Sequence, residues 1–126
     1  MIAEIACQLI ADAGFGTPGT DLFAFRAPEE RDTCILVLED LTGIAIDENL
    51  PGYIKGPFKI IVRNPDHQSA VTIASLVGAA LNLHRQTVNG FYVVRMRQTA
   101  TPITYPTPSS DVIEVSVDMW AVVVTP

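Results

Sequence analysis

Apolar and polar residues alternate in three segments of the chain, with the two-residue period of a half-buried β-strand. These segments are residues 58–63, 91–99 and 111–124. A continuous apolar run at residues 33–38 has the length of a strand and predicts one that is covered on both faces. A shorter strand is expected at residues 21–26. We therefore expect four or five strands.

Two other segments have the 3.6-residue period of a helix. Residues 2–12 are apolar except for one narrow stripe, formed by Glu4, Gln8 and Asp12. A helix with so much apolar circumference is buried on several sides, so we expect it to be shared with a neighbouring subunit. Residues 67–83 predict a second helix, with Asp66 as its N-cap and an apolar stripe that begins at Ala70.

Glycine and proline separate these elements. Gly14 suits the position just past the first helix, and Asn89-Gly90 is a turn signal. Residues 39–57 read as a long loop, expected to be mobile in the free subunit and ordered on assembly. The proline-rich stretch 102–108 is expected to be extended and poorly suited to a sheet. The pattern predicts a single α+β domain over residues 1–126, with a mainly antiparallel sheet and two helices packed on it.

The composition points to an apolar surface. Of the 126 residues 48% are apolar and only 17% are charged, against about 25% charged in an ordinary soluble domain. This shortage of charge favours an apolar surface that meets a partner, and a sheet rich in Val and Ile is the alternative. No segment is long and apolar enough to span a membrane, and the N-terminus lacks the basic start of a signal peptide. Cys7 and Cys34 give no disulfide framework, which fits a reducing cytoplasm.

Charge is distributed unevenly along the chain. The net charge of −6 argues against a nucleic-acid-binding protein. Residues 1–50 carry −8, residues 51–108 carry +5 and residues 109–126 carry −3. Arg95 and Arg97 share one face of a predicted strand, and Glu114 and Asp118 share one face of another. If the two strands pair, we expect ion pairs between these charges, and phosphate binding by the two arginines is the alternative.

Candidate catalytic and cofactor-binding patterns are weak. The glycines of residues 14–19 have the spacing of a dinucleotide-binding loop, but this loop follows a helix and precedes a strand, which is the reverse of what phosphate binding needs. The cysteines and the two histidines, His67 and His84, lack the paired spacing of a zinc site and any signature of a thiol nucleophile. The clustered acids before residue 50 are typical of a solvated face. We expect no catalytic residue, cofactor or metal.

The middle of the chain resembles a known family. Residues 27–40, APEERDTCILVLED, followed by Thr42-Gly43, are similar to a stretch of phage minor capsid and tail terminator proteins, in which a cysteine and an apolar run lead to an acid and a glycine. Residues 57–64, PFKIIVRN, resemble a strand of that family that ends in Arg. A helix follows at once, as in the family, and the chain ends in an apolar strand.

This resemblance implies a structural virion protein of a long-tailed bacteriophage. Its subunits would form a ring, commonly a hexamer, on the head-proximal end of the tail tube. The ring would stop tube growth and provide the surface for head–tail joining, so the partners would be the tube protein and a head–tail connector or stopper. DNA would pass through without being read, and no membrane would be involved. The protein would reside in the virion after assembly in the host cytoplasm.

We expect the ring contact to be head to tail, acidic surface against basic surface. The interface residues predicted from the helix and the charges are Ile2, Ile5, Leu9, Glu39, Asp40, Lys59 and Arg63. Another neck protein, such as a head completion, stopper or connector protein, is the first alternative. A small α+β ligand-binding regulatory domain is the second, and it would require a polar-lined pocket.

Overall fold

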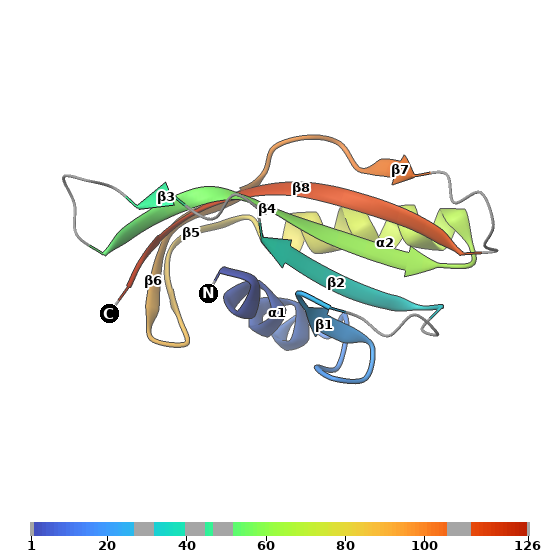
Figure 1. Ribbon diagram of the computed structural model, residues 1–126, viewed down its shortest axis with the longest axis horizontal. Coiled ribbons are helices and arrows are strands. Elements are labelled where there is room, and N and C mark those ends of the chain that lie inside the picture. Colours follow the sequence, from blue (N-terminus) through green and yellow to red (C-terminus); the bar gives the residue numbers. More distant parts are fainter. Residues whose placement is uncertain (1, 27–31, 40–44, 47–51, 106–111, 126) are drawn as a thin grey trace.

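The computed structural model describes residues 2–26, 32–39, 45–46, 52–105 and 112–125. These residues hold two helices and eight strands (Figure 1). In chain order they are α1 (Ile2–Asp12), β1 (Leu22–Ala24), β2 (Cys34–Glu39), β3 (Ala45–Ile46), β4 (Tyr53–Asn64), α2 (His67–Ala80), β5 (Leu83–Val88), β6 (Phe91–Gln98), β7 (Ile103–Tyr105) and β8 (Ile113–Val124). The combination of helices and a sheet confirms the α+β class.

All the described strands belong to one sheet. Its order is β1-β2-β4-β8-β6-β5, and in addition β3 pairs with β4 and β7 pairs with β8. β1 runs parallel to β2, and the other described pairs are antiparallel. β4 and β8 pair over twelve residues, from Tyr53 opposite Val124 to Asn64 opposite Ile113. In Figure 1 they are the two long, bent arrows at the centre of the sheet.

One face of this central strand pair carries the hydrophobic core. On β4, Phe58, Ile60 and Val62 are buried, as the alternation predicts. On β8 the buried positions are Val115, Val117, Met119, Ala121 and Val123. Both helices contribute to the same cluster, through Ile2, Ile5 and Ile10 of α1 and Ala70, Ala74 and Val77 of α2. The opposite face of β4 and β8 therefore bears the alternate residues and no helix.

The helix ends follow the predicted signals. Asp66 caps α2 by accepting a hydrogen bond from the Ser69 backbone N–H at 3.1 Å, and the hydrogen bonds from Ser69 lower the pKa of Asp66. α2 ends at Ala80, before the predicted residue 83, because β5 already begins at Leu83. Gly14 follows α1 at a φ of 84°, which favours glycine. Neither described helix has the length and hydropathy needed to cross a membrane.

The predicted loop 39–57 is wrong at its C-terminal end, where β4 begins at Tyr53 instead of Phe58. Gly56 and Pro57 are poor strand formers and hide this part of β4 in the sequence. Pro57 is tolerated because β2 ends opposite Phe58, so that among the described residues Pro57 pairs only with Trp120 of β8. Residues 40–44 and 47–51 lie outside the described part of the chain, and their mobility stays a prediction.

Three of the described strands and one bulge were not predicted. β3 is a two-residue strand inside the predicted loop 39–57, where it pairs with Ile54 and Lys55 of β4. β5 has four consecutive exposed residues and no alternation, and β7 occupies the proline-rich stretch by pairing with β8 along its edge. In β6 a register shift between Val93 and Arg95 changes the side on which the following residues lie. Val93 and Met96 both face the core as a result. A regular alternation over residues 91–99 would place Val93 on the same face as Arg95 and Arg97, and the register shift separates it from them.

Candidate interaction surface

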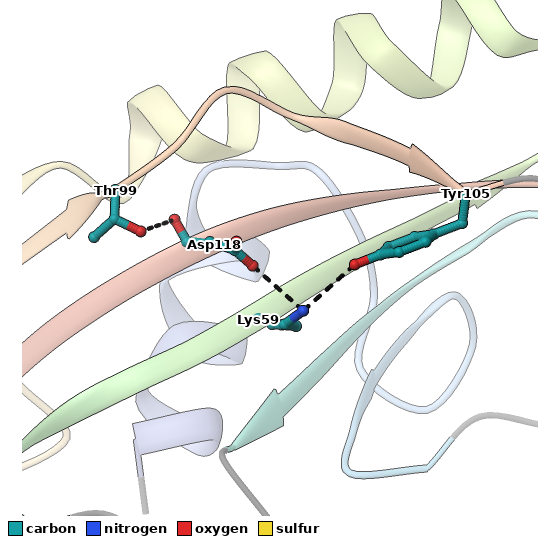
Figure 2. Close-up of polar contacts among 4 residues, drawn as sticks. All are labelled: Lys59, Thr99, Tyr105 and Asp118. Atoms are coloured by element: carbon teal, nitrogen blue, oxygen red, sulfur yellow. Dashed lines mark hydrogen bonds and ion pairs between the residues drawn. The ribbon is translucent and has the colours of Figure 1, made fainter.

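The helix-free face of the sheet is formed by the residues of β4 and β8 that alternate with the core positions. Figure 2 looks onto this face, with α1 and α2 behind the strands. Opposite residues on β4 and β8 share a face, so the register places Lys59 beside Asp118 and Arg63 beside Glu114. Antiparallel sheets often expose one face to water, and that face is then polar along its whole length. Here only one half is polar.

The polar half is held together by cross-strand ion pairs. The Lys59 Nζ lies 3.6 Å from Asp118 Oδ1, and the Arg63 Nε lies 3.5 Å from Glu114 Oε1. Lys59 also donates a hydrogen bond of 3.4 Å to the hydroxyl of Tyr105 on β7 (Figure 2). This hydrogen bond and the charge of Asp118 raise the pKa of Lys59. Thr99 binds the Asp118 backbone oxygen through its backbone N–H, at 2.9 Å.

The apolar half consists of three rows of residues that run across β4, β8 and β6. Each row has an apolar, half-buried residue of β8 in the middle. The rows are Tyr53–Val124–Tyr92, Lys55–Val122–Arg95 and Pro57–Trp120–Arg97. They contain three basic residues and no acidic residue. We call these nine residues the basic-rimmed stripe.

A hollow of about 570 Å³ lies where the polar and apolar halves meet. The residues around it are Leu38, Glu39, Pro57, Phe58, Lys59, Thr99, Asp118, Met119 and Trp120. Trp120 is the only tryptophan of the chain. Large hydrophobic and aromatic side chains with a few charges at the edge are typical of a surface that packs against another protein.

The structure places the helix residues predicted for the interface mainly in the core. Ile2 is 0% exposed and Ile5 is 1% exposed, so these side chains have no surface to offer to a neighbour. Leu9 is half-buried and packs against the core from the side. A contact between α1 and a neighbour stays a prediction, and it would have to use Leu9 and the polar stripe of the helix.

The predicted charged residues are placed differently from one another. Glu39 ends β2 and accepts hydrogen bonds from the backbone N–H groups of Ile2 and Ala3, so it binds the N-terminus of α1. Lys59 and Arg63 lie on the helix-free face in the ion pairs described above. Asp40 lies outside the described residues.

The predicted ion pairs of Arg95 and Arg97 are wrong. The two strands do pair, but the register puts Arg95 opposite Val122 and Arg97 opposite Trp120. Arg95 instead donates hydrogen bonds to Asn82 Oδ1, at 2.6 Å, and to the Leu83 carbonyl oxygen, at 2.9 Å. The cations that face Asp118 and Glu114 come from β4, a strand that was predicted but not assigned this position.

In the described part of the chain, the fold does not bring the candidate metal-binding, thiol or phosphate-binding residues together into a site. Among the described residues no group of three or more His, Cys, Asp and Glu side chains is arranged to hold a metal ion. Cys7 and Cys34 are free thiols, and burial together with the charge of Glu4 raises the pKa of Cys7 to about 11. The glycine-containing loop at residues 14–19 lies between α1 and β1, as expected, which is the wrong context for phosphate binding.

The basic-rimmed stripe was missed in the sequence, although a signal for it exists. Residues 119–124 are apolar without interruption, so β8 has apolar residues on both faces over this length. One face is the core, and the other is the stripe. Uninterrupted apolar residues in a sheet with helices on one side only indicate a second surface to be covered.

Comparisons with known proteins agree with this picture. The profile of a family described as bacteriophage tail terminator protein matches residues 9–125. A chain from the solved virion of a native gene transfer agent particle has a similar structure, with a TM-score of 0.66 and 17% sequence identity. The match covers 92% of the chain and 84% of its counterpart, so the two share a fold. No curated protein sequence matches the chain.

Proposed function

Because the chain belongs to the bacteriophage tail terminator family, a family of structural virion proteins, we propose that it forms a ring on the head-proximal end of the phage tail tube. The ring is homo-oligomeric, with six identical subunits, and it ends tube growth. It also provides the surface to which the head–tail connector or stopper binds. The protein acts through these contacts and not as an enzyme, and DNA passes through the ring without sequence-specific binding.

The observation that carries the proposal is the family match over residues 9–125, which spans every described element from the end of α1 to β8. The helix-free face supports it, because a small domain with an apolar stripe on its outer side needs a partner to cover that stripe. The family match does not by itself show a ring, its stoichiometry or its partners, and these are part of the proposal.

Ending tube growth requires two different surfaces on one subunit. One surface binds the last ring of tube protein in the way that a further tube subunit would bind. The other surface must differ from the growing end of the tube, so that no tube subunit can follow. The ring itself needs a further contact, between neighbouring subunits, and the side of the sheet with helices and the side without them are unlike surfaces that can meet in it. A contact between unlike surfaces of identical subunits closes into a ring when the rotation per subunit allows it.

Removal of the gene from the phage tests the function directly. Particles made without the protein should carry tails of uncontrolled length that fail to join heads, and electron microscopy measures both effects. Complementation with the wild-type gene should restore tails of one length. Tails of normal length that still fail to join heads would contradict termination, and would favour the alternative of a stopper or connector protein.

The oligomeric state is tested on the purified protein. Native mass spectrometry, with and without tube protein, should give a closed ring with the mass of six subunits. A protein that stays monomeric with tube protein present would contradict the proposal. Because charge steers such contacts more than it adds affinity, the ring should weaken but persist when salt is raised.

The hollow bears on the alternative of a ligand-binding regulatory domain, although such a domain would require a polar-lined pocket and the lining of this hollow is mainly apolar. Its volume of about 570 Å³ lies in the range of small-molecule sites. If the protein were a ligand-binding regulatory domain, a fluorescent apolar probe would bind equally well to the free and the assembled protein. We expect the reverse, namely that assembly displaces the probe from the helix-free face.

A further inference from the structure

The two surfaces that would meet in the proposed ring can be assigned from charge and burial. The first is the basic-rimmed stripe. The three residues of β8 at its centre, Trp120, Val122 and Val124, are half-buried. Its rim holds the exposed residues Lys55 and Arg97. Neither described helix lies on this face, and no acidic residue belongs to the three rows. The stripe therefore suits an occupant with apolar side chains flanked by negative charge.

The outer face of α1 has this character. Glu4 and Asp12 are exposed and lie two turns apart on the helix, and Gln8 between them donates a hydrogen bond of 2.8 Å to Asp12. Half-buried Cys7 and Leu9 flank this polar stripe on either side. α1 contains no basic residue.

The other described carboxylates are isolated or less exposed. Asp66 caps α2, and half-buried Asp21 accepts a hydrogen bond of 2.6 Å from the Thr17 backbone N–H. Glu114 and Asp118 are half-buried and face the cations of β4. α1 is the described element that holds two exposed carboxylates, Glu4 and Asp12, in one row.

We propose that the outer face of α1 in one subunit docks on the basic-rimmed stripe of the next copy of the chain. Carboxylates of Glu4 and Asp12 face Lys55 and Arg97 across the contact, and Leu9 approaches the Trp120 side of the stripe. This assignment rests on the proposed ring and names its interface. The sequence predicted Ile2 and Ile5 of α1 as interface residues. In this assignment the exposed side of the same helix forms the contact in their place.

The geometry of the subunit makes this contact heterologous. α1 packs on the core side of the sheet, and the stripe lies on the opposite side. One copy therefore cannot use both surfaces on the same partner, and each subunit contacts two neighbours. Contacts of this kind form closed rings or open filaments, whereas two-fold dimers need the same surface on both partners.

Charge reversal on one surface at a time tests the pairing. The first variant carries Glu4→Lys and Asp12→Lys, so both of its surfaces are basic. The second carries Lys55→Glu and Arg97→Glu, so both are acidic. A third variant combines the four substitutions, and Asp32→Lys, an exposed acid outside both surfaces, is the control. All are exposed positions, and thermal unfolding of each variant checks that it folds.

The expected result is a specific pattern of loss and rescue. Each of the first two variants alone should need at least about tenfold more protein to form rings, because like charges then meet across the contact. An equimolar mixture of the two should restore assembly in alternating order, so native mass spectrometry should find equal numbers of both in a six-membered ring. The combined variant and the Asp32→Lys control should assemble like the wild type.

Trp120 provides an independent readout, because it is the only tryptophan and lies in the stripe. Quenching of its fluorescence by neutral acrylamide should decrease when the wild type or the mixture assembles, and should stay unchanged for either variant alone. Rings of the wild type in which Trp120 remains as quenchable as in the monomer would overturn the proposal.

Other outcomes separate the interface from the function. If both single-surface variants form rings as well as the wild type, or if the mixture does not restore assembly, the interface is wrong while the ring stands. If they form rings but no longer bind tube protein, the stripe is a tube-binding surface and the proposal is overturned. If the wild type forms no ring even with tube protein present, the proposed function fails and the interface fails with it.

Discussion

Gly78 of α2 lies so close to Gln98 of β6 that a Cβ atom on the glycine would overlap the side-chain amide of Gln98. The helix therefore packs closely on the sheet at this position. Gly78→Leu should lower the free energy of unfolding by about 2–3 kcal/mol through overpacking, although leucine is a better helix former by about 1 kcal/mol. Gly78→Ala should be nearly neutral, since the flexible end of Gln98 can move aside. Urea unfolding measures both, and a stable Leu variant would contradict the close packing.

The hydrogen bond between Glu39 and the Ile2 backbone N–H, at 2.8 Å, ties the start of α1 to the end of β2. Glu39→Ala should lower the free energy of unfolding by about 1 kcal/mol, because it leaves the N-terminal N–H groups of the helix without this acceptor. Glu39→Gln retains an oxygen acceptor and should lose less. Amide exchange at Ile2 and Ala3 should accelerate in the Ala variant, and unchanged exchange there would rule out the capping role.

The two faces of β4 should respond differently to truncation. Phe58 is 2% exposed and packs in the core, so Phe58→Ala should cost about 3–5 kcal/mol of unfolding free energy. Ile61 is half-buried on the helix-free face, and Ile61→Ala should cost clearly less. Both variants can be compared by denaturant unfolding of the free subunit. Equal losses would mean that the helix-free face is as well packed as the core.

The pair Arg63–Glu114 should contribute little to the stability of the subunit. Its Nε–Oε1 distance is 3.5 Å, but both side chains remain partly open to solvent. A double-mutant cycle with Arg63→Met and Glu114→Gln should therefore give a coupling energy of about 0–1 kcal/mol that shrinks in salt. Reversal of Arg63 to Glu would place two acids opposite each other, so charge reversal there tests the fold and is a poor test of assembly.

Cys7 should react slowly with alkylating reagents. Because burial raises the pKa of its thiol from 9.0 to about 11, its thiolate fraction at pH 8 should be about a hundredfold below that in the unfolded chain. Mass spectrometry after treatment with iodoacetamide, in buffer and in urea, measures the ratio. Rapid alkylation of the native protein would contradict the raised pKa.

The same shift links the stability of the fold to pH. A raised pKa in the folded state means that the protonated thiol stabilises the fold below about pH 9, and that this contribution is lost as the pH rises through about 11. The decrease in unfolding free energy between pH 9 and pH 11 should therefore be smaller in Cys7→Ala than in the wild type. Cys7→Ala isolates this effect, because every other titratable group is the same in the two proteins.

The sequence predicts those elements whose pattern is produced by one buried face. The alternation of Phe58, Ile60 and Val62, and the cap at Asp66, correspond to the observed β4 and α2. β5 was not predicted, because an edge strand with exposed residues on both faces has no alternation of apolar and polar residues. The start of β4 was not predicted because its Gly56 and Pro57 are common in loops, and its pairing with β8 is a property of the sheet.

Cross-strand partners depend on register, and register cannot be derived from the sequence of either strand alone. The acids of β8 were correctly placed on one face, but their partners proved to be Lys59 and Arg63 of β4, while the arginines of β6 lie beside Val122 and Trp120. A bulge of one residue in β6 was enough to regroup its side chains. The candidate surface could therefore be predicted in composition but not in arrangement.

The position of β8 in the sheet has a consequence for the order of folding. β8 is the last described strand in sequence, yet it lies between β4 and β6 and is the link between the two halves of the sheet. Until residue 124 has been synthesised, the nascent chain can form the β2–β4 pair and the β5–β6 hairpin, but no continuous sheet joins them. Its contacts to β4 close loops of many residues, which slows folding. The edge of β4 that pairs with β8 is left unpaired meanwhile, and a chaperone that shields it would act during this interval.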